Sequence, residues 1–285
     1  MSLSLTVIGA GRVGKTLARC LHRLELVTIV NVVTRSSASA QAAVTFIGAG
    51  TPRSDVGKLA KANIYLLAVP DDQIVRCCEQ LADNNQFEPG DIVFHCSGAL
   101  ASSVLVAAIE AGAAVASVHP VRSFADPERV AETIAGTYFG IEGDAAALLV
   151  LSPLFEALGC LLVPLQGGAK TLYHAAAVFA SNYVVSILAV AQDAYIAAGI
   201  PTDLALNMLV PLTRETVENV LRIGPQDALT GPIARGDQET VARQQKAVET
   251  WNADYGVLYE RLADATRRLA ARKNKTPIDS RPISS

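Results

Sequence analysis

The sequence lacks the features expected of a nucleic-acid-binding, disulfide-bonded or metal-binding protein. Its 285 residues carry a formal net charge of only −3, so neither nucleic acid nor an anionic membrane is indicated as a partner. The five cysteines show neither C-x-x-C nor Cys/His spacing, and no metal is predicted. Their odd number and irregular spacing indicate a reduced, cytoplasmic environment. An apparent strand at residue 3 leaves no room for a signal peptide, so we expect none.

Charged residues are also scarce. The chain is 51% hydrophobic and 18% charged, which predicts a large core and a buried subunit interface, and therefore a homodimer. The stretch 172–191 has no formal charge and is long enough to cross a bilayer. Because it contains His174, Ser181 and Asn182, a helix buried between two subunits explains it better.

The opening of the chain has the pattern of a dinucleotide-binding turn. The residues 3–8 predict a strand, and the spacing of 16–24 predicts a helix. Between them lies G-x-G-x-x-G, in which the first glycine permits the turn, the second admits a pyrophosphate and the third allows close helix packing. The phosphates would meet the helix N-terminus. The predicted contacts are Gly9, Ala10, Gly11, Arg12, Val13 and Gly14.

The same stretch also fits a phosphate loop of an ATPase, with Lys15 and Thr16 as its Lys and hydroxyl. The end of the next predicted strand, 26–33, favours the dinucleotide. No acidic residue stands there to hold a ribose 2′-hydroxyl, whereas an arginine among hydroxyls suits a 2′-phosphate, so NADP is preferred over NAD. These residues are Thr34, Arg35, Ser36 and Ser37. An ATPase would also need an Asp ending a strand, and Asp71 follows Pro70 instead.

The order of elements predicts two domains. Apolar strands alternate with helices up to residue 165, which indicates a doubly wound, mostly parallel sheet of the α/β class. Short helices are expected at 38–46 and 55–61, and Asp72 is expected to cap a helix ending near residue 81. Residues 166–272 read as an all-helical dimerisation domain, with a kink at Pro211, and 273–285 as a disordered tail.

Ligands of an open parallel sheet lie beyond the carboxyl ends of its strands, so polar residues there are candidates. For the cofactor these are Val69, Pro70, Asp71, Cys96 and Ser97. Near the substrate we expect Ser97 and His119 as positioning groups and Arg122 as a carboxylate ligand. Alternatively, Arg122 pairs with an acid such as Asp126, and His95 is a packed core residue.

A further group lies on the apolar helix and beyond it. Lys170, His174 and Ser181 share one helical face, with Asn182 a third of a turn away, unless the first turn is simply solvated. Arg235 follows a loop shaped by glycine and proline, and it either binds a substrate carboxylate or pairs with an acid. Asp237 is expected to cap the helix after that loop.

Taken together, these motifs resemble a known group of enzymes. The N-terminal half is similar to the NADP-binding domain of pyrroline-5-carboxylate reductase, the 6-phosphogluconate and β-hydroxyacid dehydrogenases, and ketopantoate reductase. Five motifs resemble more narrowly the bacterial Rossmann-like proteins whose helical C-terminal domain has no assigned function, over residues 3 to 265. These motifs are 69–72, 95–98, 119–124, 170–174 and 229–237.

The resemblance implies an NADP-dependent reductase or dehydrogenase of a small oxo or imino acid. It implies that Lys170 is the general acid or base, whereas His174 replaces the Asn of the β-hydroxyacid dehydrogenases. We therefore predict that Lys170, His174, His119 and Ser97 are catalytic, and that Arg122, Asn182 and Arg235 contact substrate. The alternatives are a non-catalytic NADP-binding sensor and a phosphate-loop ATPase.

Overall fold

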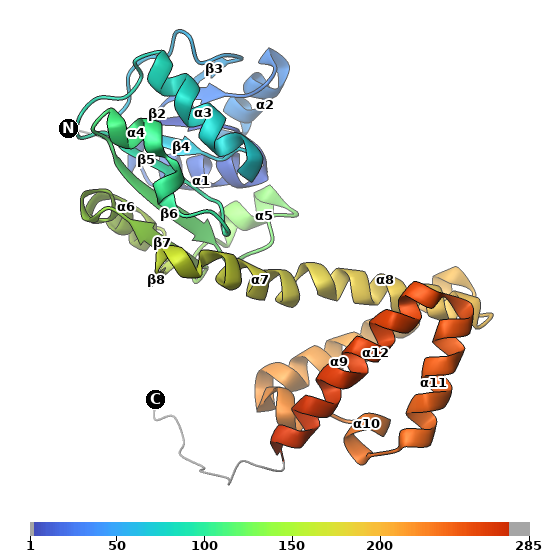
Figure 1. Cartoon of the computed structure of the whole chain (residues 1–285). Coiled ribbons are helices and arrows are strands. Elements are labelled where there is room, and N and C mark those ends of the chain that lie inside the picture. Colours follow the sequence, from blue (N-terminus) through green and yellow to red (C-terminus); the bar gives the residue numbers. More distant parts are fainter. Residues whose placement is uncertain (1–2, 274–285) are drawn as a thin grey trace. The chain divides into compact units, whose positions relative to one another are not determined.

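The computed structural model describes residues 3–273 and divides the chain into two compact units, Met1–Ser181 and Asn182–Ser285 (Figure 1). The first unit extends to residue 181 because the helix that begins at Lys170 is anchored in it, and the domain boundary at 165 stays a prediction. Lys273 ends the last helix, and the remainder of the predicted tail lies outside the described residues.

The first unit is built on one eight-stranded sheet in the order β3-β2-β1-β4-β5-β6-β7-β8. All neighbouring strands pair in parallel except β6 and β7, which are antiparallel. The prediction of a mostly parallel sheet is confirmed. The strands are β1 Leu3–Ile8, β2 Val27–Val33, β3 Thr51–Arg53, β4 Ile64–Leu67, β5 Ile92–His95, β6 Ala114–Pro120, β7 Tyr138–Gly143 and β8 Leu161–Pro164.

Helices cover both faces of this sheet, because its central strands are apolar on both sides; all four residues of β4 and of β5 are buried. On one face pack α1 (Arg12–Arg23), α2 (Ser37–Ile47), α5 (Pro127–Glu132) and α6 (Ala145–Ala157). On the other pack α3 (Asp71–Asp83), the 3-10 turn η1 (Ser102–Val104) and α4 (Val106–Glu110). The turn η2 (Gly167–Ala169) and α7 (Lys170–Ala180) complete the unit.

Two local expectations in this unit are wrong. Residues 55–61 form no helix, because the Asp55 carboxylate accepts the Gly57 N–H at 2.9 Å and closes a turn instead. Asp72 does not cap α3, which begins one residue earlier at Asp71 with Pro70 in the cap position. The three-residue strand β3 was not predicted, since so short an edge strand has no readable pattern.

The second unit is helical throughout the part of it that is described. It contains α8 (Asn182–Ala197), α9 (Thr202–Ala228), α10 (Pro232–Arg235), α11 (Gln238–Trp251) and α12 (Ala253–Lys273). Pro211 lies inside α9, and the break falls instead at Gly224, whose φ is +80°. Asp237 caps α11 as predicted, accepting the Thr240 N–H at 3.0 Å.

The long apolar helix is not continuous. Ser181, with φ −127° and ψ −71°, ends α7, and α8 begins at the next residue, so Ser181 does not extend the face of Lys170 and His174. Ser and Asn side chains compete with helical hydrogen bonds for the backbone, which explains a break at this pair. By length and composition alone, the stretch Gly167–Ala197 would reach across a membrane.

Candidate active site

The turn after β1 contains three glycines, of which Gly9 and Gly14 are tightly packed and Gly11 is open. A Cβ on Gly9, which has φ +86°, would lie 2.6 Å from the Ala68 carbonyl oxygen, and one on Gly14 would lie 2.2 Å from the Gly9 oxygen. At Gly11, by contrast, no atom of the described residues would lie within 4 Å. The N-terminus of the 12-residue helix α1 follows at once. An open backbone beside a helix N-terminus suits a pyrophosphate.

The geometry of Lys15 and Thr16 contradicts the phosphate-loop interpretation. Lys15 Nζ lies over the Phe46 ring, 4.7 Å from its centroid. Thr16 is fully buried, and its hydroxyl donates to the Arg12 carbonyl at 2.6 Å. Neither side chain is turned to the anion position, so the ATPase alternative is wrong on structural grounds.

The end of β2 leads into a second helix N-terminus with exposed arginines nearby in the fold. Ser36 caps the 11-residue helix α2 by accepting the Ser39 N–H at 3.2 Å, and Ser37 is the first residue of that helix. Arg35, just before the cap, is exposed. Arg53, also exposed, ends the neighbouring strand β3 and is a second cation that sequence reasoning missed. A helix N-terminus and guanidinium groups are both suited to bind a phosphate.

Ser97 shapes a turn rather than offering its hydroxyl to a substrate. The hydroxyl donates to the Asp71 carboxylate at 2.8 Å and accepts N–H groups from Ala99 at 3.1 Å and Leu100 at 2.9 Å. A serine hydroxyl has one donor and two acceptor positions, so its capacity is used up. The predicted catalytic role of Ser97 is therefore corrected to a structural one, which it shares with Asp71.

His95 is a core residue, as its alternative interpretation proposed. It is 0% exposed, its Nδ1 accepts the Ser97 N–H at 3.1 Å, and its Nε2 lies 3.3 Å from the Ala101 carbonyl. Nδ1 must therefore be unprotonated and Nε2 must carry the hydrogen. Burial lowers the pKa of His95 to about 4, which keeps the ring neutral.

Lys170 lies beneath the same turn. Its side chain is 1% exposed, and Nζ donates to the Ser97 carbonyl at 2.9 Å and to the Ser117 hydroxyl at 2.6 Å. Burial lowers the pKa of Lys170, and the nearby Glu142 carboxylate opposes this shift. Glu142 in turn accepts the N–H and the hydroxyl of Ser102, at 2.7 and 2.8 Å. The ammonium group thus holds the backbone of Ser97 to the side chain of Ser117.

Three rings crowd the exposed side of this turn. His119 Nδ1 lies 3.0 Å from the Tyr173 hydroxyl, and the His119 and His174 rings meet edge to face with centroids 5.2 Å apart. A Cβ on Gly98 would come within 2.2 Å of His174 Nδ1 and 2.8 Å of His119 Nε2. Only glycine lets both rings approach the backbone here. His174 Nδ1 is buried without a hydrogen-bond partner among the described residues.

Burial lowers the pKa of His119 to about 4, and the charges of His174 and Lys170 act in the same direction. Burial also raises the pKa of Tyr173. At neutral pH the pair is therefore an uncharged imidazole beside a protonated phenol. The predicted sharing of one helical face by Lys170 and His174 is confirmed, since both side chains reach the segment 97–98.

Arg122, predicted as a carboxylate ligand, has a different role. It donates to the Thr133 hydroxyl at 2.5 Å, to the Thr133 carbonyl and to the Thr137 hydroxyl at 3.1 Å, so its guanidinium ties together the ends of the connection between α5 and β7. It is engaged neither as a free carboxylate ligand nor with Asp126. Cys96 stays a predicted cofactor contact, and burial raises the pKa of its thiol to about 12, which keeps it protonated.

The remaining predicted substrate residues belong to the second unit. Asn182 begins α8. Arg235 is exposed and lines a pocket of about 470 Å³. That pocket is formed by Gln226, Leu229, Thr230, Gly231, Ala234, Arg235 and Ala270. Asp237 caps α11, and the hydrogen bonds of Thr240 together with the charges of Arg243 and Arg235 lower its pKa.

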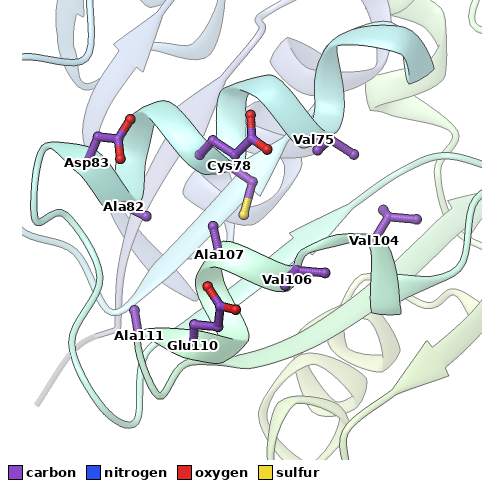
Figure 2. Close-up of a pocket in the computed structure, with 10 residues that line it drawn as sticks. Val75, Cys78, Ala82, Asp83, Val104, Val106, Ala107, Glu110 and Ala111 are labelled. Atoms are coloured by element: carbon purple, nitrogen blue, oxygen red, sulfur yellow. The ribbon is translucent and has the colours of Figure 1, made fainter.

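A second hollow in the first unit is separate from these residues. It has a volume of about 540 Å³ and lies between α3 and the segment from η1 to α4 (Figure 2). Its walls are formed by valines and alanines, with Glu79, Asp83 and Glu110 at its edge. None of the predicted site residues lines it. Within residues 3–273, no cluster of His, Cys, Asp and Glu is arranged to hold a metal ion.

Sequence reasoning missed Tyr173, Ser117 and Glu142 and gave Gly98 only as part of a motif. Their contacts are distant in sequence, since Tyr173 meets His119 across 54 residues and Lys170 meets Ser117 across 53. The i, i+3 and i, i+4 spacing of Lys170, Tyr173 and His174 was the one clue to Tyr173.

Comparison with known proteins agrees with this architecture. Residues 1–120 match the Rossmann-like domain, and residues 137–266 match a domain of unknown function, DUF2520. No curated protein gives a significant match.

Among solved structures, a Bacteroides fragilis protein assigned as an NADP oxidoreductase is 21% identical, with 94% of this chain and 98% of that chain covered and a TM-score of 0.76. Protein TM1727 of Thermotoga maritima is 25% identical, with 95% and 99% covered and a TM-score of 0.72. An imine reductase of Myxococcus stipitatus in complex with NADP+ is 19% identical, with 95% and 94% covered and a TM-score of 0.58.

Proposed function

We propose that this chain, which joins a Rossmann-like domain to a DUF2520 domain, is an NADP(H)-dependent oxidoreductase of a small oxo or imino acid. The observation that carries the proposal is the presence of two helix N-termini suited to phosphate at strand ends of one sheet. The open backbone at Gly11 would receive the pyrophosphate, and Arg35 at the start of α2 would receive the 2′-phosphate. The likeness in fold to NADP oxidoreductases supports the same cofactor.

The chemistry follows from the residues at the neighbouring strand ends. When bound, NADPH supplies a hydride to the substrate carbon. The π electron pair of the C=O or C=N bond then moves to the oxygen or nitrogen, which takes one proton from the protein. Lys170, His119 and His174 are among the titratable groups at this rim that could supply the proton. For a carboxylate on the substrate, we keep Arg235 of the second unit as a separate prediction.

The proposal includes a cytoplasmic homodimer formed through the C-terminal helices. The exposed apolar side chains of those helices support it; Val185 is 68% and Leu221 81% exposed. The alternative is a sensor that binds NADP without turnover. Oxidation of NADPH tested against glyoxylate, pyruvate and a cyclic imino acid distinguishes the two. Binding with no turnover on any of them favours the sensor.

The cofactor is tested by Arg35→Asp, with binding of NADPH and NADH measured by calorimetry. We expect NADPH affinity to fall at least about tenfold, or about 1.4 kcal/mol, while NADH affinity changes little. Arg76→Asp, on the exposed surface of α3, is the matched control. Equal weakening of both cofactors by Arg35→Asp, or no binding of NADPH by the wild type, contradicts the proposal.

A further inference from the structure

The Tyr173 hydroxyl is held in a fixed position next to His119. The Tyr173 hydroxyl lies 3.0 Å from His119 Nδ1, and its oxygen is also faced by the Gly140 backbone. Gly140 is itself required there, since a Cβ on it would lie 2.5 Å from the Tyr173 oxygen. The phenol is held so closely by β7 that its position relative to His119 is set by the sheet.

Burial favours a neutral His119 ring and a protonated Tyr173 phenol. In that state the phenol hydroxyl can donate to an unprotonated His119 Nδ1 across their 3.0 Å contact. A neutral imidazole that accepts at Nδ1 carries its hydrogen on Nε2. The same logic operates in His95, where an accepting Nδ1 sets an Nε2–H tautomer.

His119 Nε2 is left without a protein partner. It makes no hydrogen bond within residues 3–273, and it is not among the buried side-chain atoms that lack a partner there, so it is accessible. A substrate oxygen or nitrogen about 3 Å from its accessible side would be within hydrogen-bond distance. Lys170, in contrast, directs its ammonium to Ser97 and Ser117.

We propose that His119 is the catalytic proton donor of this enzyme, acting as a neutral imidazole whose Nε2–H tautomer is fixed by the positioning residue Tyr173. This inference rests on the proposed oxidoreductase function. Lys170 then acts as a positioning residue beneath the turn. A neutral donor aimed at the site where negative charge develops needs no reorganisation during the reaction.

The proton that the substrate gains is replaced from water. As hydride reaches the substrate carbon, the electron pair on the heteroatom takes the Nε2 proton of His119. Nδ1 takes the hydroxyl proton of Tyr173, and the phenolate takes a proton from water, which leaves hydroxide. After the product leaves, Nε2 takes a proton from water and Nδ1 gives its proton to the hydroxide, which restores the Nε2–H tautomer. The transfer is downhill because an alkoxide or amide anion is a stronger base than a phenolate.

The tautomer is tested directly by nitrogen NMR of the full-length protein labelled at histidine. The chain has only four histidines, so single His→Gln variants assign their signals. We expect the His119 signals of a single Nε2–H tautomer, and in Tyr173→Phe a mixture of both tautomers. Tyr138→Phe, on the exposed side of β7, is the matched control and should change nothing. A protonated Nδ1 in the neutral wild-type ring overturns the proposal.

Kinetics test the chemical role with NADPH and whichever oxo or imino acid of the panel is reduced. His119→Ala should lower kcat by roughly 100-fold or more, as does loss of other charge-stabilising donors. Tyr173→Phe should lower kcat about 10-fold to 100-fold with KM for NADPH unchanged, as expected for an outer-shell partner. His119→Gln, which keeps an N–H donor, should recover part of the loss. Full turnover in His119→Ala, or its abolition by Lys170→Met alone, overturns the proposal.

Failure of the proposed function and failure of this inference give different results. If wild-type protein does not bind NADPH in calorimetry, the oxidoreductase function fails. If NADPH binds but the panel is not reduced, oxamate is titrated into the complex with NADP+ as a stable mimic of an oxo acid. A shift of His119 Nε2 then supports the inference, and an unshifted His119 overturns it.

Discussion

The two units of this chain bury their apolar side chains to very different degrees. In the first, apolar residues from strands and helices form two clusters, one on each face of the sheet. In the described part of the second, the buried hydrophobic residues are Ala205, Leu209, Val241 and Ala263. Many of its larger apolar side chains are exposed. The first unit therefore has a core on each face of its sheet, whereas much of the apolar surface of the second is uncovered.

The largest effect is expected where a charge is placed on that uncovered surface. If a second copy covers the second unit, Leu221→Glu buries an unpaired carboxylate and should raise the dimer dissociation constant at least about 100-fold. Sedimentation or light scattering over a range of concentrations measures it. Leu149→Glu, a residue 77% exposed on α6 of the first unit, is the control. A wild-type protein that is monomeric at all concentrations contradicts the expectation.

The packing of the first unit can be tested at its glycine turn. Gly14→Ala places a Cβ 2.2 Å from the Gly9 oxygen and should lower the free energy of unfolding by about 3 kcal/mol. Gly11→Ala meets open space and should change stability by less than about 0.5 kcal/mol, yet it should weaken NADPH binding. Chemical denaturation and calorimetry separate the two effects. Equal stability of both variants would show that the close packing is not needed.

The same unit should lose stability in mild acid. His95 is neutral in the fold, with its pKa lowered from 6.5 to about 4, so the unfolded chain binds more protons between these values. Stability is therefore highest above pH 6.5 and falls as the pH drops to 4, by on the order of 3 kcal/mol from this group. Melting curves across this range should show a smaller slope in His95→Gln. An unchanged slope would place the acid sensitivity elsewhere, for example at His119.

The smallest effect concerns a contribution of the second unit to catalysis. Arg235→Gln should raise KM for an oxo acid about tenfold without changing NADPH affinity, as expected if it holds a carboxylate. Arg243→Gln, on the surface of α11, serves as the comparison. If neither variant changes KM, the guanidinium of Arg235 has no part in substrate binding.

The sequence predicts those parts of the molecule that depend on near neighbours. The strand, the glycines and α1 at the start of the chain follow from local spacing, as do the breaks near Gly199, Gly224 and Gly231. Pro211 shows the limit of such rules, because α9 continues through it and its non-helical backbone lies at Gly224 instead.

The site itself was predicted only in part. His119 and Lys170 were found because strand ends and the first turn of a helix are recognisable places. The hydrogen bonds that engage Ser97, Arg122 and Lys170 were not predicted. Each is made with a partner that is distant in sequence or lies in a loop. Counting the hydrogen bonds that a side chain makes requires coordinates. That count shows that the Ser97 hydroxyl is fully hydrogen-bonded and has a structural role.

Ser97 joins four segments of the first unit at one residue. Its hydroxyl, N–H and carbonyl are bonded to the start of α3, the end of β5, a serine of β6 and the first turn of α7. A displacement of any one of these segments would therefore affect the hydrogen bonds that Ser97 makes with the other three. The imidazoles of His119 and His174, which lie against Gly98, belong to two of these segments, so their positions are set by the same residue.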